Sequence, residues 1–278
     1  MHSLAHAETF HPVIGPVAEA EALYVRQLRL GERLEHHTGE FVVWDVGLGA
    51  AANPLTVLRA TRHWPGNLRI LSFDHTLEPL EFALAHSQHL PYLIGSEEQL
   101  QRLMSDRRVS FRNDAQTVHW EVHLADFPSL LRQSVAEGFV KPHLIMFDAF
   151  SPARNPAMWT QPLFADLFRL LDPRRPCALP TYSRSTMLRV TLLLAGFFVG
   201  VGHATGEKEE TTVAANTLDL IETPLDERWL ERAHRSTSAE PLWSPDYRQA
   251  KLSAESWQRL REHPQFTNNS VKKPGRNA

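Results

Sequence analysis

Residues 41–53 read FVVWDVGLGAAAN. The first six are a short apolar run of β-branched and aromatic side chains, which is typical of a buried strand, and two glycines then allow a tight turn into a helix. A glycine turn directly after a strand also lets the backbone approach a ligand closely. In a dinucleotide-binding turn the third glycine would stand at position 52, which is alanine here. The turn alone is therefore equally compatible with an ordinary strand-to-helix connection.

Further short apolar segments follow at intervals along the chain. Together with the first, they predict seven strands, at residues 41–46, 69–74, 118–124, 143–150, 177–182, 197–202 and 211–216. Helical spacing of apolar residues predicts helices at 17–36 and near 54–63, 78–87, 96–104, 127–137, 160–171 and 186–195. Strands that alternate with helices predict an α/β fold with a mainly parallel seven-stranded sheet and helices on both faces.

The composition is that of an ordinary globular protein. The 278 residues are 42% hydrophobic and 22% charged, with a net charge of −3, which excludes a collagen, a coiled coil or a largely disordered chain. This balance also argues against coating of nucleic acid by bulk charge. Cys177 is the only cysteine, and no apolar run has the length of a membrane span or the pattern of a signal peptide. We therefore expect a cytoplasmic protein.

The strand-rich part of the sequence is expected to form a single domain over residues 15–225. Residues 1–14 show no clear period and are interpreted as an N-terminal arm. Helical stretches with three tryptophans predict a C-terminal helical extension at 226–263, packed on the domain. The segment 264–278 ends in basic residues without an acidic one and is expected to be a disordered basic tail.

Acidic residues follow four of the predicted strands. The carboxyl ends of parallel strands meet at the edge where ligands bind, and an acid after the second strand is where a nucleoside-binding fold holds a ribose. One such acid often only caps the next helix, but four in register are expected to share one rim. A rim of this charge favours a cationic cofactor, such as the sulfonium of S-adenosylmethionine, over a pyrophosphate. The four acids are Asp45, Asp74, Asp126 and Asp148.

A second informative segment, at residues 148–159, reads DAFSPARNPAMW and follows the fourth predicted strand. Its two prolines and its Asn-Pro step disfavour a helix before about Thr160. Such a segment is compatible with a rigid crossover loop, and equally with a loop that holds an amine or a flat ring beside a cofactor. The residue types alone do not separate these two interpretations.

Several motifs together resemble one family. They are DVGLGAAAN at 45–53, FDAFSPARNPAMW at 147–159, TYS at 181–183, AGF at 195–197 and GEKE at 206–209. Over roughly residues 15–216, the sequence resembles the methyltransferase domain of the bacterial tRNA 5-methylaminomethyl-2-thiouridine biosynthesis proteins. The resemblance implies a Rossmann-like class I methyltransferase that uses S-adenosyl-L-methionine to N-methylate the aminomethyl group of wobble 5-aminomethyl-2-thiouridine in tRNA. Some family members also carry an FAD-dependent oxidase domain, so the resemblance allows for a separate FAD oxidase partner.

The resemblance also implies the residues of the cofactor site. Gly47 and Gly49 would approach the methionine part of S-adenosyl-L-methionine. Asp74 would hold the ribose, and Asp126 would hold the adenine amino group. The whole cofactor-binding set is Asp45, Gly47, Gly49, Asn53, Asp74, Asp126 and Asp148.

Asp148 is in addition the candidate catalytic residue. A primary alkylamine has a pKa of about 10, so it arrives protonated at neutral pH and must lose a proton before it can attack. Asp148 would orient the amine and accept this proton directly or through water, with Tyr182 as a secondary partner. The residues expected to shape the substrate loop are Phe150, Pro152, Arg154, Asn155, Pro156 and Trp159, with Arg184 beside them.

Two residues depart from the family pattern. Ala51 stands where the first turn normally has its third glycine, and Ala149 stands where glycine usually follows the loop aspartate. A methyl group at either position is expected to narrow the pocket. A methyltransferase that acts on a small amine or another non-RNA substrate through the same cofactor pocket is the first alternative. The two departures leave a non-catalytic S-adenosylmethionine-binding or interaction protein as a further alternative. No metal site is expected, because His119 and His123 lack a third ligand at a telling spacing.

Binding of tRNA to a protein of net charge −3 requires a confined basic face. Arg154 and Arg184 are the most informative candidates, because each sits beside a loop of the predicted site, where it could contact a phosphate or the wobble base. Scattered arginines are also commonly a solvated surface. The other candidates are Arg59, Arg62, Arg107, Arg108, Arg169, Arg174, Arg175 and Arg189, together with Lys272 and Lys273 of the tail.

Overall fold

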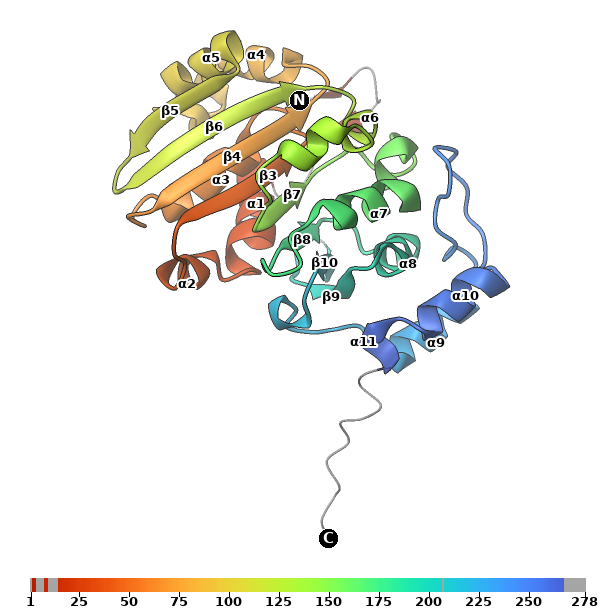
Figure 1. Ribbon diagram of the computed structural model, residues 1–278. Helices are drawn as coiled ribbons and strands as arrows, with labels where there is room; N and C mark the ends of the chain where they lie inside the picture. The colour runs from red at the N-terminus through yellow and green to blue at the C-terminus, as the bar shows by residue number, and fades with distance from the viewer. Residues whose placement is uncertain (1, 4–7, 10–14, 207, 268–278) are drawn as a thin grey trace.

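The structure is a computed structural model that describes residues 2–3, 8–9, 15–206 and 208–267 (Figure 1). Its centre is a mixed sheet of eight strands in the order β5-β6-β4-β3-β7-β8-β10-β9. The strands are β3 (Glu40–Val46), β4 (Asn67–Asp74), β5 (Arg108–Asn113), β6 (Gln116–Leu124), β7 (Leu144–Phe147), β8 (Ala178–Thr181), β9 (Phe198–Gly202) and β10 (Thr211–Ala215). The five central strands β6, β4, β3, β7 and β8 pair in parallel, whereas β5 and β10 are antiparallel to their neighbours.

All seven predicted strands are present, so the α/β class is confirmed. The eighth strand, β5, forms a hairpin with β6 at one edge of the sheet and was not predicted. Its Val109 and Phe111 alternate with charged or polar residues, as in many edge strands, and this short pattern gives a weak signal. Left-handed residues bound the strand, with Arg107 at φ 61° before it and Asp114 at φ 57° in the hairpin turn.

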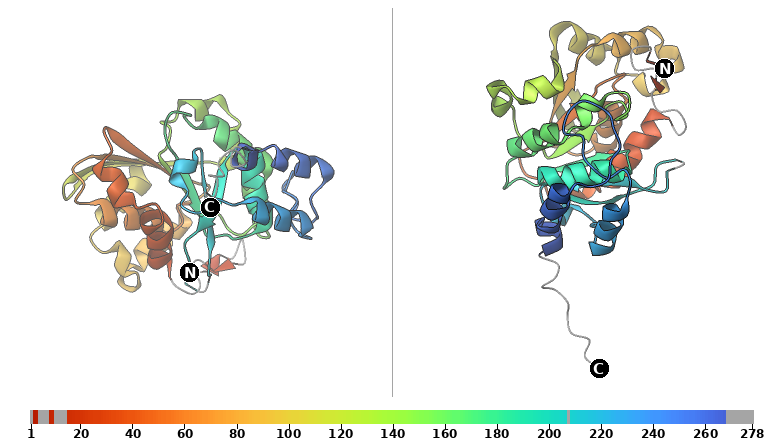
Figure 2. Two further views of the ribbon diagram at one scale, coloured as in Figure 1. Left: turned by 90° about the horizontal axis from the view of Figure 1, so that it is seen from below. Right: turned by 90° about the vertical axis from the view of Figure 1, so that its right-hand side faces the viewer.

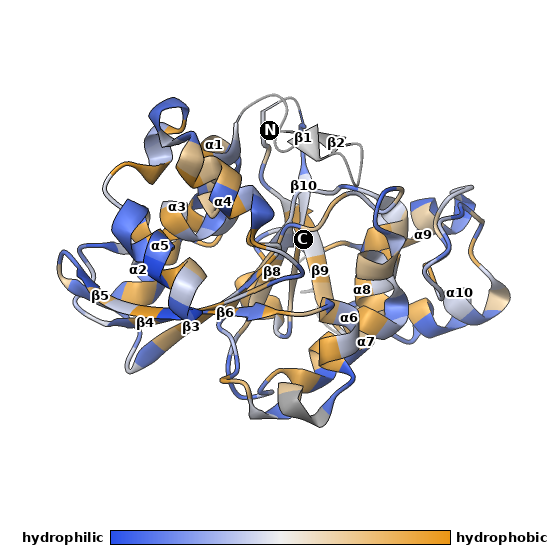
Figure 3. Cartoon of the chain, turned by 90° about the horizontal axis from the view of Figure 1, so that it is seen from above, coloured by the Kyte–Doolittle hydropathy of each residue, from blue (hydrophilic) through white to orange (hydrophobic). Residues whose placement is uncertain are grey.

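Helices cover both faces of the sheet (Figure 3). Along β3, Phe41 and Val43 belong to one apolar cluster, and Val42 and Trp44 belong to the other, because successive side chains of a strand point to opposite faces. The first face is covered by α1 (Pro16–Ala20), α2 (Leu30–Glu35), α3 (Ala52–Thr61), α4 (Glu78–Ala85) and α5 (Glu97–Asp106), and the second by α6 (Phe127–Leu131), α7 (Gln161–Leu170) and α8 (Thr186–Ala195). Short 3₁₀ turns are η2 (Ser87–His89), η3 (Pro91–Leu93), η4 (Ser134–Gly138), η5 (Pro156–Trp159) and η6 (Leu218–Leu220).

The prediction of one continuous helix at 17–36 is wrong. A π-helical segment, η1 (Glu21–Arg26), follows α1 directly, and α2 begins only after Arg29, whose φ of 46° breaks the helical path. Apolar spacing does not distinguish a π turn from an α turn, because the inserted residue shifts the pattern by a single position. The helix predicted at 127–137 is also shorter than expected, since α6 ends at Leu131 and η4 follows it.

Three C-terminal helices, α9 (Glu227–Arg235), α10 (Ala254–Arg261) and α11 (Pro264–Thr267), lie beside α8 and the β9 edge (Figures 1 and 2). Trp229 and Leu260 belong to the apolar cluster on the α8 side of the sheet. Residues 264–267 were expected to begin a disordered tail, but they form α11 and bury Phe266. The rest of the predicted tail, 268–278, lies outside the described residues.

The edge strand β9 is covered by two later segments of the chain. The amide of Leu225 donates a hydrogen bond to the carbonyl of Val199, and the amide of Val201 donates one to the carbonyl of Thr223. The fully buried side chain of Gln265 completes the pairing, with Oε1 accepting from the Val199 amide at 2.8 Å and Nε2 donating to the carbonyls of Val199 and Leu225 at 2.8 Å each. The polar backbone groups of Val199 that face away from the sheet are therefore all paired.

The predicted N-terminal arm contains one described pair of short strands. These are β1 (His2–Ser3) and β2 (Glu8–Thr9), which pair antiparallel, and the other arm residues lie outside the described part. Within the described ranges, every helix is too short or too polar to cross a lipid bilayer.

Candidate active site

The first turn of the candidate site leaves no room for a side chain at Gly47. Gly47 has a φ of 96°, and its amide donates a hydrogen bond to the carbonyl of Phe73 at 2.9 Å. A Cβ atom at Gly47 would lie 2.9 Å from the backbone carbonyl oxygen of Asp148. The loop after β3 thus passes directly against the end of β7, and both its φ and its contacts require glycine.

The acid at the end of β4 holds the same turn from the other side. Oδ2 of Asp74 accepts a hydrogen bond from the amide of Gly49 at 3.0 Å, and Oδ1 accepts one from the amide of His75 at 2.8 Å. Nδ1 of His75 also lies 3.1 Å from Oδ1, and this hydrogen bond to Asp74 raises the pKa of His75. The sequence-predicted cofactor residues Gly49 and Asp74 are therefore in direct contact.

Asp148 stands where β7 ends and the proline-containing loop begins. Nδ2 of Asn53 donates a hydrogen bond to Oδ2 of Asp148 at 2.8 Å, which joins the start of α3 to the loop. The Tyr182 hydroxyl donates to the carbonyl of Ala149 at 2.9 Å. Asn53 therefore contacts Asp148 directly, and Tyr182 contacts the residue that follows Asp148.

Trp159 anchors the proline-containing loop from inside the core. Its indole nitrogen donates a hydrogen bond to the carbonyl of Phe150 at 2.7 Å, and the side chain is fully buried. The ring also meets the ring of Tyr182 edge-on, with centroids 6.1 Å apart. Trp159 therefore shapes the loop from behind and presents no surface to a ligand.

Asp45 is a fully buried carboxyl group below the turn. Oδ2 accepts a hydrogen bond from the Ser72 hydroxyl at 2.7 Å, which in turn accepts one from the indole of Trp120 at 2.9 Å. Oδ1 has no hydrogen-bond partner among the described residues. Burial, above all, raises the pKa of Asp45 to about 7, and the charges of Asp148 and Asp74 act in the same direction. A cationic or donor group bound nearby would favour the ionised form of this acid.

Tyr24 belongs to the same region, and the sequence analysis did not predict it. It lies in the π-helical segment η1, and its buried hydroxyl has no hydrogen-bond partner among the described residues. Burial raises the pKa of Tyr24 well above its usual value, and the carboxylates of Asp148, Glu19 and Asp45 raise it further. An orphaned hydroxyl beside these acids offers a donor to a bound molecule. Residue 24 lies within the helix predicted at 17–36, and nothing in that pattern singled out Tyr24.

Lys208 is a second residue that the sequence analysis did not assign. It lies in the segment between β9 and β10, and its Nζ is 4.5 Å from the centroid of the Tyr182 ring and 4.0 Å from Oε1 of Glu19. A cation over an aromatic face is attracted by the ring quadrupole. The GEKE motif at 206–209 contains Lys208, so this motif carried a signal for it.

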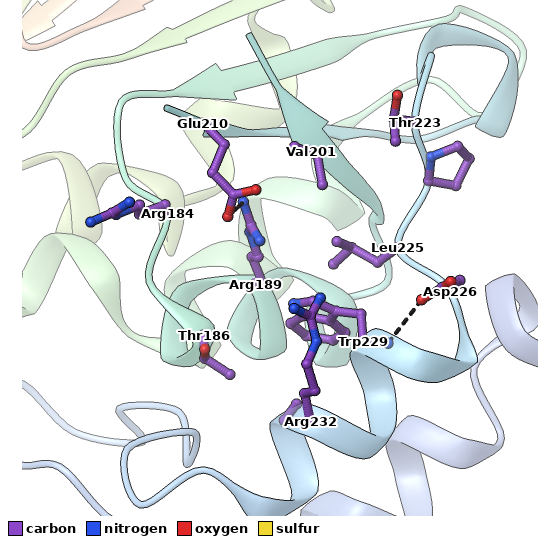
Figure 4. A pocket seen from close by; sticks show the side chains of 12 residues that line it. Arg184, Thr186, Arg189, Val201, Glu210, Thr223, Leu225, Asp226, Trp229 and Arg232 are labelled. Atoms are coloured by element: carbon purple, nitrogen blue, oxygen red, sulfur yellow. Dashed lines mark hydrogen bonds and ion pairs between the residues drawn. The ribbon is translucent and has the colours of Figure 1, made fainter. Parts of the chain in front are cut away.

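Other predicted site residues lie farther from this centre or have structural roles. Asp126 is exposed and caps α6, with Oδ2 accepting from the amide of Ser129 at 3.0 Å. Arg154 is exposed at the tip of the proline-containing loop, and Arg184 lines a different pocket (Figure 4). Pro152, Asn155 and Pro156 are half-buried in the loop, but no hydrogen bond of the Asn155 side chain to a described residue fixes its role.

Ala51 and Ala149 were expected to narrow the pocket, and this expectation stays a prediction. Both side chains are buried within the hydrophobic clusters, so their methyl groups pack in the core. Ala51 instead adopts a left-handed conformation with φ 62° as it caps α3. For a residue other than glycine this conformation costs roughly 1 kcal/mol. Alanine in place of glycine at position 51 therefore strains the backbone at the start of α3.

The arrangement fits a cationic cofactor bound over the turn after β3. The turn has a glycine, Gly47, where a Cβ would collide, and the acids Asp45 and Asp148 with the Tyr24 hydroxyl face the same region. Among the described residues, no group of three or more His, Cys, Asp or Glu side chains is arranged to hold a metal ion.

Comparisons with known proteins agree with this geometry. The family model of S-adenosyl-L-methionine-dependent methyltransferases matches residues 96–217. The chain is 30% identical, over 84% of its length, to the tRNA 5-methylaminomethyl-2-thiouridine biosynthesis bifunctional protein MnmC of Methylibium petroleiphilum, and 30% identical, over 77% of its length, to that of Cupriavidus metallidurans. These alignments cover 35% and 32% of the two relatives, so the chain spans about a third of the curated proteins that it matches.

A solved structure shares the fold. The crystal structure of MnmC2 from Aquifex aeolicus superposes with a TM-score of 0.63 at 20% sequence identity, covering 95% of this chain and 79% of that one. The chain therefore belongs to the S-adenosyl-L-methionine-dependent methyltransferases of class I fold, and it is similar to the methyltransferase part of the bifunctional MnmC proteins.

Proposed function

We propose that this protein transfers a methyl group to a primary amine on tRNA, namely the aminomethyl group of wobble 5-aminomethyl-2-thiouridine. The observation that carries the proposal is the placement of Asp148, which the Asn53 side chain holds at the end of β7 against the Gly47 turn. The names of the MnmC relatives, which refer to 5-methylaminomethyl-2-thiouridine in tRNA, support the substrate.

The cofactor site is proposed to use the residues gathered around the turn after β3. Gly47 and Gly49 would let the backbone approach the methionine part, and Asp45 below them carries an unpaired buried oxygen suited to a cationic group. Asp74 would turn from the Gly49 amide toward the ribose, and Asp126 would reach the adenine amino group with the oxygen that does not cap α6. When bound, S-adenosyl-L-methionine supplies a methyl group on positively charged sulfur, which is open to attack by an amine.

Asp148 is proposed to prepare the substrate amine. Its Oδ2 already accepts a hydrogen bond from Asn53, which fixes the carboxylate in one orientation. The carboxylate would then accept a hydrogen bond from the substrate ammonium and take up its proton directly or through water. A fixed orientation matters because alignment of two reactants can supply several kcal/mol of a reaction barrier.

Tyr182, Tyr24 and Lys208 are proposed to complete the walls of the site. The ring of Tyr182 lies between Lys208 and Trp159, and its hydroxyl is committed to the Ala149 carbonyl. We therefore infer that Tyr182 acts as a positioning residue for the loop that follows Asp148. The unpaired hydroxyl of Tyr24 would donate to the cofactor or to the amine once either is bound.

Two broader features belong to the same proposal. Residues 15–225 would form the methyltransferase domain, with 226–263 as an extension of it. A separate FAD oxidase would supply part of the modification. The protein would act on its tRNA substrate in the cytoplasm.

The direct test is methyl transfer from labelled S-adenosyl-L-methionine. The acceptors are tRNA isolated from cells that lack this modification, fully modified tRNA, and a panel of small primary amines. We expect transfer to the undermodified tRNA alone. Transfer to small amines with none to tRNA would show that the substrate is a small amine and not tRNA. Calorimetric binding of S-adenosyl-L-methionine without any transfer would indicate a non-catalytic binding protein.

A further inference from the structure

A pocket of about 380 Å³ lies between α8, β9 and α9, apart from the cofactor site (Figure 4). None of its lining residues belongs to the proposed cofactor set. Arg189 lines it from α8, Arg184 from the loop after β8, and Arg232 from α9. Three arginines from three separate elements thus line one cavity.

Arg189 is held rigidly in the wall of this pocket. Its side chain is 4% exposed, with Nε donating to the Thr212 hydroxyl at 3.0 Å and Nη2 donating to the Thr211 carbonyl at 2.8 Å. Oε1 of Glu210 lies 3.1 Å from Nη2 and balances this charge. Nη1 has no hydrogen-bond partner among the described residues, so it remains a donor for a bound anion.

The two other guanidinium groups have no such balance. Arg184 and Arg232 are exposed, and neither has a hydrogen-bond or ion-pair partner in the part of the chain that the structure describes. The second acid of the pocket, Asp226, is engaged in capping α9 through the Trp229 amide at 2.8 Å. Burial lowers the pKa of Arg189, and the charges of Arg232 and Arg184 lower it further. The three cations therefore repel one another, and an anion between them would relieve that repulsion.

The position of the pocket indicates which anion it takes. Arg184 lies two residues after Tyr182, so one short loop joins the pocket to the proposed methyl-transfer site. Arginine forks match phosphate oxygens, and RNA places a phosphate on either side of every nucleotide. We propose that Arg184, Arg189 and Arg232 form a subsite for a backbone phosphate of the RNA whose base enters the active site. This inference rests on the proposed function, and it assigns part of RNA binding to the C-terminal extension through α9.

The test compares arginine variants of the pocket with an arginine variant outside it, and each single variant loses one positive charge. Arg184→Gln and Arg232→Gln, singly and together, are compared with Arg235→Gln, which lies on the same helix but does not line the pocket. We expect the double variant to bind undermodified tRNA about tenfold more weakly, with a log–log salt slope reduced by about 0.7–0.9, because the loss of one phosphate contact removes that much of the slope. Arg235→Gln should stay within about twofold of the wild type. Calorimetry with S-adenosyl-L-methionine verifies that each variant remains folded and binds cofactor.

Each outcome separates this inference from the proposed function. If the wild type methylates tRNA but the double variant binds it as tightly as Arg235→Gln does, the phosphate subsite is overturned and the function stands. If the wild type neither binds nor methylates tRNA, the proposed function fails first. Inorganic phosphate, titrated against chloride at constant ionic strength, forms a third arm. If phosphate binds the pocket without competing with tRNA, the pocket is a site for a free anion and not a subsite for RNA.

Discussion

The carboxylate of Asp148 is proposed to accept a proton while it remains fixed by Asn53. Asp148→Asn keeps the shape and leaves an oxygen that can accept the Asn53 hydrogen bond, but it removes the basic group. We expect turnover to fall by about 10²- to 10⁴-fold, the usual contribution of general acid–base catalysis, with cofactor affinity changed far less. Single-turnover methyl transfer and calorimetry measure the two effects separately. Unchanged turnover would remove Asp148 from the mechanism.

The buried acid Asp45 predicts an unusual pH dependence of stability. Its pKa in the folded protein is about 7, above the unfolded value near 4, so the folded state binds the proton more tightly. This contribution to the free energy of unfolding is full below about pH 4 and is lost as the pH rises to about 7, by on the order of 4 kcal/mol.

Urea unfolding of the cofactor-free protein between pH 4 and 8 measures this effect. The Asp45→Asn variant should lack this pH-dependent contribution. The free energy of unfolding of the variant minus that of the wild type should therefore increase with pH. His143 and His263 have lowered pKa values of about 3 and about 4 because they are buried, and they act in the opposite direction in both proteins. Their effect cancels in the difference. A difference independent of pH would contradict the raised pKa of Asp45.

Two glycines provide a matched pair for the turn after β3. Gly39 and Gly47 have φ values of 88° and 96°, so alanine at either position costs similar backbone strain, roughly 1 kcal/mol. A Cβ at Gly39 would meet nothing within 4 Å, whereas a Cβ at Gly47 would meet the Asp148 carbonyl at 2.9 Å. We expect only Gly47→Ala to weaken S-adenosyl-L-methionine binding, by tenfold or more in calorimetry. Equal affinities in the two variants would show that the close approach is irrelevant to the cofactor.

At the scale of elements, the π-helical segment η1 places Tyr24 under the site. A buried hydroxyl without a partner destabilises the empty protein, by about 1 kcal/mol or more. Tyr24→Phe should therefore raise the melting temperature of the cofactor-free protein while it lowers cofactor affinity or turnover. Tyr92→Phe provides the contrast, because the Tyr92 hydroxyl donates to the Ala50 carbonyl at 3.3 Å and its loss should lower stability. A less stable but fully active Tyr24→Phe protein would contradict this role.

The sequence predicted the central elements because their signals are local. Buried parallel strands such as β3 and β4 are continuous apolar runs, and the acids Asp74 at the end of β4 and Asp148 after β7 lie where strand order places them. The π segment η1 left no such signal, since its apolar spacing resembles that of an α-helix. Tyr24 could not be recognised for a related reason: two of the residues that act on its hydroxyl, Asp148 and Tyr182, come more than a hundred positions later.

At the scale of the whole molecule, one side chain joins the C-terminal extension to the sheet. Gln265 makes three hydrogen bonds to backbone groups of Val199 and Leu225. Gln265→Leu should lower the free energy of unfolding by about 2–4 kcal/mol, because buried donors and acceptors lose their partner. Gln258→Leu on the exposed face of α10 should change it by less than about 0.5 kcal/mol. Equal effects in urea unfolding would remove the special role of Gln265.

No pattern in the sequence announced this connection. Residues 264–267 follow a helix, contain a proline and precede a basic segment, so they resembled the start of a tail. Burial of Gln265 depends on a strand 66 residues earlier, and single-sequence periodicity carries no information about such a distant partner. The same limit applies to the pocket of Arg184, Arg189 and Arg232, in which the third arginine comes from the extension.

The covered β9 edge also bears on how copies of the protein behave toward one another in concentrated solution. An open edge strand offers unpaired donors and acceptors to any extended chain, and it can start growth of a sheet from molecule to molecule. Here the segment 223–225 and the Gln265 side chain form hydrogen bonds with backbone groups of β9, so these groups are not available to another chain. Deletion of residues 264–278 should therefore produce concentration-dependent association in light scattering, whereas deletion of 268–278 alone should leave monodisperse protein.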